Sequence, residues 1–114
     1  MLQVAPSTRI FVCNHLVDFR KCIDGLAAVC RNKLDQEPYQ GALFVFRNRT
    51  RTSIKVLVYD GQGFWLCTKR LSKGKFHWWP EESVIDARQI QTLLWNGNPD
   101  FAKFSDDWRK IDGT

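Results

Sequence analysis

Apolar and polar positions divide the first part of the chain into a strand and a helix. The segment RIFVC (9–13) is a short run of β-branched and aromatic residues, which predicts a strand. Between residues 23 and 34 the apolar residues recur at steps of three and four, which predicts a helix of about four turns. We expect Asp18 to be its N-cap and Pro38 to lie beyond its end.

Strand patterns then continue to residue 79. ALFVF (42–46), SIKVLVY (53–59) and GFWLCTKRL (63–71) predict three strands, and KFHWW (75–79) predicts a short fourth. YDGQGF and LSKGK contain the glycines of tight hairpins. The expected fold is therefore α+β: a short strand and a helix, an antiparallel meander of three or four strands, and C-terminal helices. The first helix is expected to cover one apolar face of the sheet, while the other face mixes aromatic residues with lysine.

The pattern changes after Pro80. Asp86 and Gln89 are spaced as a capping box for a helix that ends with Gly97 at the C′ position. Residues 98–114 form an acidic tail with aromatic residues at helical spacing, which either docks on its own domain or contacts a partner. We therefore divide the chain into a domain at 1–97 and an amphipathic tail at 98–114.

Size and composition favour one soluble domain. The chain has 114 residues with 44% hydrophobic content, enough for one core. Its longest apolar run is far shorter than the ~20 residues of a membrane span, and MLQVAPSTR does not resemble a secretory signal, so we expect a cytoplasmic protein without a membrane partner. The four cysteines show no zinc spacing and are expected to be buried reduced thiols, so neither a metal nor another cofactor is expected.

Positive charge is concentrated in the middle of the chain. Residues 41–75 contain eight basic residues and one acidic residue, whereas the rest contains nine basic and eleven acidic residues. This asymmetry is typical of a surface that binds nucleic acid. The candidate nucleic-acid-binding residues are Arg47, Arg49, Arg51, Lys55, Lys69, Arg70, Lys73 and Lys75.

The arginines at alternate positions suggest a row of charge. In an extended conformation Arg47, Arg49 and Arg51 would project from one side, about 6.6 Å apart at a rise of ~3.3 Å per residue. In a meander, this segment and the turn after residue 70 lie at the same end of the sheet, so the two basic clusters should converge. The alternative is that these charges only keep turns and edge strands solvated.

Aromatic residues accompany the charges. Trp65, Trp78 and Trp79 are candidates for base stacking or for contact with a partner, although core packing is the simpler explanation for many aromatic residues. Because neighbouring residues of a strand face opposite sides, one of the adjacent tryptophans is expected to be partly exposed or covered by the tail.

A metal-dependent nuclease is the enzyme alternative. Asp60 follows an apolar strand, and a metal site there would recruit further carboxylates from Asp18, Asp24, Glu81 and Glu82. Each of the five also fits a structural role in a cap, turn or loop. No nucleophile elbow or phosphate-binding glycine loop is present in the sequence, so we expect no catalytic residues.

Four linked motifs resemble a known family. VDFRKCIDGLAAV and GALFVFRNRTRTSIKVLVYDGQGFWLCTKRLSKGKFHWW are similar to the accessory protein of the insertion sequence 66 family of bacterial mobile elements, over about residues 9–97. That protein is often called TnpB, and it differs from the RNA-guided nuclease of the same name. The positions that fit the motifs are Asp18, Arg20, Lys21, Gly25, Arg47, Arg49, Lys55, Asp60, Gly61, Gly63, Lys69, Arg70 and Gly74.

The resemblance implies a role in transposition without catalysis. Together with the charge distribution, it leads to the hypothesis of an accessory protein that binds the DNA of element ends beside the transposase encoded by the same element. The alternative is a protein-interaction subunit that bridges transposase molecules without binding DNA itself.

Overall fold

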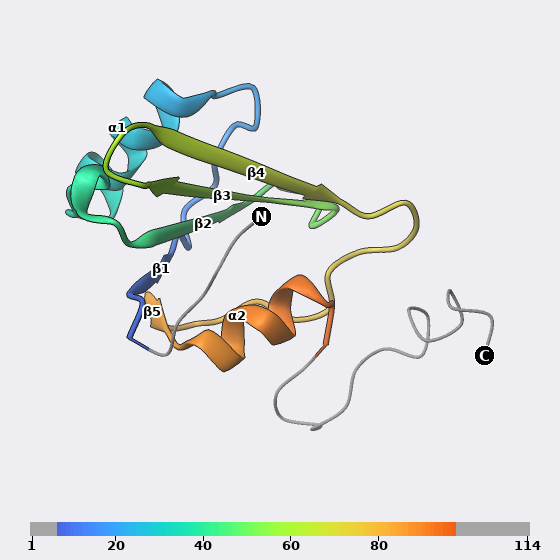
Figure 1. The fold of residues 1–114 in the computed structure, drawn as a ribbon. Coiled ribbons are helices and arrows are strands. Elements are labelled where there is room, and N and C mark those ends of the chain that lie inside the picture. The colour runs from blue at the N-terminus through green and yellow to red at the C-terminus, as the bar shows by residue number, and fades with distance from the viewer. Residues whose placement is uncertain (1–6, 98–114) are drawn as a thin grey trace.

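The computed structural model describes residues 7–97, which form a mixed five-stranded sheet with two α-helices (Figure 1). The sheet order is β4-β3-β2-β1-β5. β1 lies parallel to β2, while β2, β3 and β4 form the predicted antiparallel meander. The elements are β1 (Ile10–Val12), α1 (Ile23–Lys33), a 3₁₀ turn η1 (Pro38–Gln40), β2 (Leu43–Arg47), β3 (Ser53–Tyr59), β4 (Phe64–Arg70), β5 (Val84–Ile85) and α2 (Ala87–Leu94).

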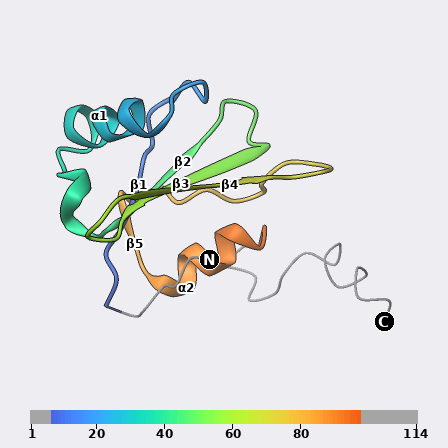
Figure 2. The same cartoon turned by 45° about the horizontal axis from the view of Figure 1, so that its top comes forward.

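The helices cover opposite faces of the sheet, so the fold has three layers (Figure 2). Phe44 and Leu57 pack with Leu26 of α1 on one face. Val45 and Val56 lie on the other face, within the apolar cluster that includes α2. The α+β class is confirmed, but the expectation of a single covered face was wrong. Central residues of β2 and β3 such as Phe44, Val45, Val56 and Leu57 are apolar on both sides because each side meets a helix.

The segment KFHWW is not a strand, contrary to the prediction. Its backbone groups already have other partners. Phe76 N–H donates to the Arg51 carbonyl at 2.8 Å. The Asn96 side chain accepts from the His77 N–H and donates to the Lys75 carbonyl. The remaining strand is β5, which pairs with β1. Trp78 and Trp79 are consequently not on opposite sides of a strand, and both lie half-buried against the α2-side cluster.

The helix caps follow the sequence at α2 but not at α1. Asp86 and Gln89 form the predicted capping box. α1 begins only after Cys22, because the Asp18 carboxylate accepts bonds from the Arg20 backbone and guanidinium instead of capping the helix. At the end of α2, Asn96 takes the left-handed conformation with φ 58°, one residue before the predicted Gly97.

The cysteines are free, as predicted, but only two are buried. Cys13 and Cys30 lie in the core, and burial raises the pKa of the Cys30 thiol to about 12. Cys22 is exposed and Cys67 is half-buried. Within residues 7–97, neither helix is long and apolar enough to cross a membrane. The predicted tail at 98–114 lies outside the described residues.

Candidate nucleic-acid interface

Two basic turns lie side by side at one end of the meander. The first turn (48–52) joins β2 to β3, and the second (71–75) follows β4. Leu71 N–H donates to the Thr52 carbonyl at 2.9 Å, and the Phe76 N–H bond to the Arg51 carbonyl links the turns again. We call the two turns together with Arg70, the last residue of β4, the basic end; its cationic residues are Arg49, Arg51, Arg70, Lys73 and Lys75, all of them exposed.

The first turn is held by the Asn48 side chain. Its Oδ1 accepts from the backbone N–H groups of Thr52 and Ser53 at 2.9 and 3.1 Å, and its Nδ2 donates to the Thr52 hydroxyl. Arg51 adopts the left-handed conformation with φ 61°. The predicted extended row of arginines is therefore wrong, because only Arg47 belongs to a strand. Arg49 and Arg51 instead lie in a compact turn between β2 and β3.

Two cations at the base of the turns pack on tryptophan rings on the α2 side of the sheet. Arg47 pairs with Ile54, which pairs with Lys69, so both cations share one sheet face. The Arg47 guanidinium lies 5.4 Å from the centre of the Trp79 ring, and the Lys69 ammonium lies 5.2 Å from that of Trp95. Lys69 also donates to the Leu94 carbonyl.

Both of these cations are partly desolvated at the charged group, although Lys69 as a whole is exposed and Arg47 is half-buried. Desolvation lowers the pKa of Arg47, and the nearby positive charge of Arg51 lowers it further. Desolvation also lowers the pKa of Lys69. These two residues thus contribute packing as well as charge.

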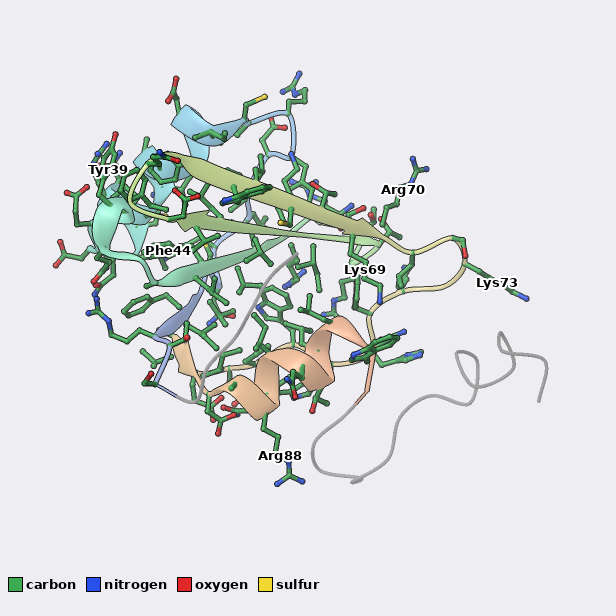
Figure 3. The ribbon with its side chains drawn as sticks, in the orientation of Figure 1. Tyr39, Phe44, Lys69, Arg70, Lys73 and Arg88 are labelled. Carbon is green, nitrogen blue, oxygen red and sulfur yellow. The ribbon has the colours of Figure 1, made fainter. Side chains whose placement is uncertain are left out.

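Lys55 lies on the opposite face and has a structural role. Its ammonium donates to the carbonyls of Phe19 and Lys21 at 2.8 and 3.3 Å and lies over the Phe19 ring. It therefore fastens the loop before α1 to β3. Arg70 and Lys73, in contrast, extend from the basic end into solvent (Figure 3).

Carboxylates do not neutralise the basic end within the described part of the chain. The ion pairs found among residues 7–97 are Arg20 with Asp18 at 2.7 Å and Arg31 with Glu37 at 3.2 Å. Both ion pairs lie in or next to α1 and outside the two turns. Among residues 7–97, none of the cations of the basic end forms an ion pair.

The opposite end of the meander is the hairpin at 60–63. Asp60 Oδ1 accepts from the N–H groups of Gln62 and Gly63, both at 2.9 Å, and Oδ2 accepts from the Trp65 indole at 2.8 Å. These bonds lower the pKa of the Asp60 carboxyl. Trp65, with 55% of its surface exposed, therefore lies beside an anion and away from the basic turns.

The carboxylates considered for a nuclease do not gather in the described structure. Asp60 holds its hairpin, and Asp18 binds Arg20 with its pKa lowered to about 2 by those hydrogen bonds. Among residues 7–97, no group of three or more histidine, cysteine and acidic side chains could hold a metal ion.

Many motif positions maintain the backbone. A Cβ added at Gly25 would lie 3.0 Å from the Lys21 Cβ, so glycine makes room for the loop that Lys55 fastens. Gly61 and Gly74 have φ of 96° and 79°, which favours glycine in these turns. The motif positions that remain at or beside the basic end are Arg47, Arg49, Lys69 and Arg70.

Trp95 and Asn96 were missed by sequence reasoning. Trp95 follows α2 with 51% of its surface exposed, and Asn96 bonds to the segment after the second turn. They are about 20 residues from that turn in sequence, and only packing of α2 brings them near it. The sequence does contain one indication of them: a tryptophan that directly follows the apolar stripe of a predicted helix, where a large apolar side chain can remain exposed.

Comparison with known proteins identifies related sequences. A family model described as IS66 Orf2 like protein matches residues 8–99. The chain is 36% identical to Uncharacterized protein y4hO of Sinorhizobium fredii over 97 residues, which are 82% of this chain and 84% of the relative. It is 38% identical to Uncharacterized protein y4jC of the same organism over 76 residues, 67% of this chain and 65% of the relative. No solved structure matches the chain.

Proposed function

The chain belongs to the IS66 Orf2 like protein family, and from this premise we propose that it is a non-catalytic accessory protein of transposition that binds DNA through its basic end. Family membership indicates the accessory role in transposition. The DNA contact, the element ends as its target and the transposase as its partner are the proposed steps.

The hydrogen bonding between the two turns carries this proposal. Basic residues that only keep edge strands solvated have no need to lie close together. Here the hydrogen bonds of Leu71 and Phe76 to the first turn hold the basic residues of both turns next to each other. Five exposed cations at one end, without a neighbouring carboxylate in residues 7–97, form a surface suited to phosphates. Contacts between such cations and the phosphates of DNA bind it without reading its base sequence.

Salt dependence is the first test. If about five phosphates are contacted, log K should fall with log salt with a slope of about −4.5, so affinity for an element-end duplex should drop by about 500-fold between 50 and 200 mM salt. The triple variant Arg49→Gln, Lys73→Gln and Lys75→Gln should reduce this slope by about 2.7. At 100 mM salt it should bind several hundred-fold more weakly, as measured by fluorescence anisotropy.

A matched control removes the same charge elsewhere. Arg9, Lys33 and Arg88 are exposed outside the basic end, and Arg88 points away from it (Figure 3). Their triple glutamine variant should keep the slope and bind within about threefold of the unmodified protein. Equal losses in both variants would contradict a localised interface.

Other outcomes would favour the alternatives. A protein that binds no DNA at 50 mM salt but forms a complex with the transposase of its element would have the bridging role. Cleavage of element DNA with Mg²⁺ or Mn²⁺ that is lost in Asp60→Ala would instead indicate a nuclease.

A further inference from the structure

We propose that the chain forms a dimer by pairing its edge strand β4 with β4 of a second copy, antiparallel and centred on Cys67. This inference goes beyond the proposed function and does not depend on DNA binding. It is based on the outer edge of β4 and on the order of the side chains along that strand.

β4 is the longer of the two strands at the edges of the sheet. It pairs with β3 on one side, and no strand of residues 7–97 pairs with its other side (Figure 1). β5, at the opposite edge, has only two residues. A long exposed strand edge is a template for pairing with another chain unless charge, proline or a bulge protects it. The first four residues of β4, FWLC, contain neither a charge nor a proline, and their pairing with β3 is continuous.

Backbone hydrogen bonds show which residues of β4 present their polar groups at the outer edge. Asp60 N–H donates to the Gly63 carbonyl at 3.0 Å, and Leu71 N–H donates to the Thr52 carbonyl at 2.9 Å. Since bonding positions alternate in an antiparallel pair, the odd-numbered residues between them also bond toward β3. The N–H and C=O groups that point away from β3 belong to Phe64, Leu66, Thr68 and Arg70.

A twofold axis at Cys67 pairs these outward groups in both copies. Cys67 then faces Cys67 of the second copy as a non-hydrogen-bonded pair. Leu66 faces Thr68 and Phe64 faces Arg70, so every outward N–H meets an outward carbonyl. All seven residues of β4 are paired in this register, and the two sheets join into one.

The same register places aromatic rings opposite cations. Trp65, with 55% of its surface exposed, faces Lys69 of the second copy, and the half-buried Phe64 faces Arg70. Arg70 forms no ion pair among residues 7–97, so its guanidinium is available to the ring. The Lys69 ammonium bonds to the end of α2, and its methylene stem covers the opposing ring. The Asp60 carboxylate, which accepts from the Trp65 indole, adds a negative charge where the basic residues of the second copy approach.

Mass and thiol cross-linking test this dimer. Sedimentation equilibrium of the full chain at about 10 to 200 µM should show a species of twice the chain mass. Copper(II) phenanthroline oxidises two thiols to a disulfide, which takes up two electrons and releases two protons. In the Cys22→Ser variant, which lacks the exposed thiol, it should link two chains through Cys67. The Cα atoms of such a pair lie about 4.5 Å apart, within disulfide range, and the further change Cys67→Ser should abolish the link.

Proline variants at the two edges of the sheet provide a matched comparison. Thr68→Pro removes an outward N–H without removing a bond to β3, so the dissociation constant of the dimer should rise by at least about fivefold. Val84→Pro is the control. Val12 N–H donates to the Ser83 carbonyl, so by the same alternation the Val84 N–H points outward from β5. This variant should change the dissociation constant by less than about twofold.

Other results would overturn pairing through β4. These are a chain that stays monomeric at the highest concentration, or a dimer that both proline variants weaken equally or not at all. If Thr68→Pro lost its circular dichroism spectrum, the cross-link would decide, and its absence in the Cys22→Ser variant would overturn the proposal. A monomer that binds DNA would leave the proposed function intact, whereas a dimer that binds no DNA would leave only this inference standing.

Discussion

The two ends of β3 are built alike and differ in charge. At each end one side chain accepts two backbone N–H groups: Asn48 in the first basic turn and Asp60 in the opposite hairpin. Each end also has a half-exposed tryptophan, Trp95 near the basic turns and Trp65 in the hairpin. The Trp95 ring lies beside an ammonium, whereas the Trp65 indole donates to a carboxylate.

This difference shows how an exposed aromatic residue should be interpreted. Judged by exposure alone, Trp65 and Trp95 would be equally good candidates for contact with a nucleic acid. The neighbouring charge separates them, since a phosphate backbone is attracted to one end and repelled from the other. The three predictions below test whether this contrast has functional consequences.

Charge changes at the two ends should produce the largest difference. Lys73→Glu with Lys75→Glu removes two phosphate contacts and adds repulsion, so DNA affinity at 100 mM salt should fall by at least about 60-fold. Gln62→Lys adds a cation at the hairpin and should change affinity by less than threefold. Anisotropy titrations check both. An increase of similar size in Gln62→Lys would mean that the hairpin end also contacts DNA.

Removal of the Asn48 side chain should give an intermediate effect. Asn48→Ala leaves two N–H groups of the first turn without their acceptor, so the free energy of unfolding should fall by about 1–2 kcal/mol. The turn should loosen and DNA affinity should fall by about 5- to 10-fold, the value of one phosphate contact. Urea unfolding and anisotropy measure the two effects.

Asn48→Asp is the informative companion. It keeps the acceptor oxygen but adds negative charge, so stability should be retained while DNA affinity still falls. A variant that lost stability but bound DNA normally would show that the shape of the turn is unimportant.

The hairpin should give the smallest effect, visible as pH dependence and not in DNA binding. The folded-state pKa of Asp60 is lowered below its ordinary value of 3.8, so its ionised form contributes stability above about pH 4. This contribution is lost as the pH falls through the lowered pKa. Asp60→Asn should therefore be less stable than the unmodified protein at pH 7, with the difference shrinking toward pH 2.

Urea unfolding at pH 7, 4 and 2 measures this difference, and subtraction between the two proteins removes the contribution of Asp18. A constant difference at all three pH values would contradict the assigned role of the Asp60 charge. DNA affinity should remain within about twofold at pH 7.

Short-range patterns predicted one helix cap correctly and another wrongly. The capping box of Asp86 and Gln89 depends on residues three apart, and it forms as expected. The Asp18 cap failed because the guanidinium of Arg20, two residues away, competes for the same carboxylate. The KFHWW strand failed because Asn96, far along the chain, takes the backbone groups that a strand partner would need.

The candidate interface was predicted in part. The meander order correctly indicated that both basic turns share one end. It did not reveal that Lys55 would be engaged by carbonyls on the α1 side, that Arg51 would turn back in a left-handed conformation, or that Trp95 would join the region. The Lys55 and Trp95 contacts join residues distant in sequence, whereas Arg51 lies in a turn that the nearby Asn48 side chain holds.

The sequence by itself determined the strand, helix and meander order, the concentration of positive charge and the family. These features depend on periodicity, turn residues and composition, which act over a few neighbouring residues. Only the tertiary structure decided which cations face outward together, which are fastened to the protein and which tryptophan lies beside them. The reason is that strand register and helix docking place each side chain on a face, and both follow from packing across the whole domain.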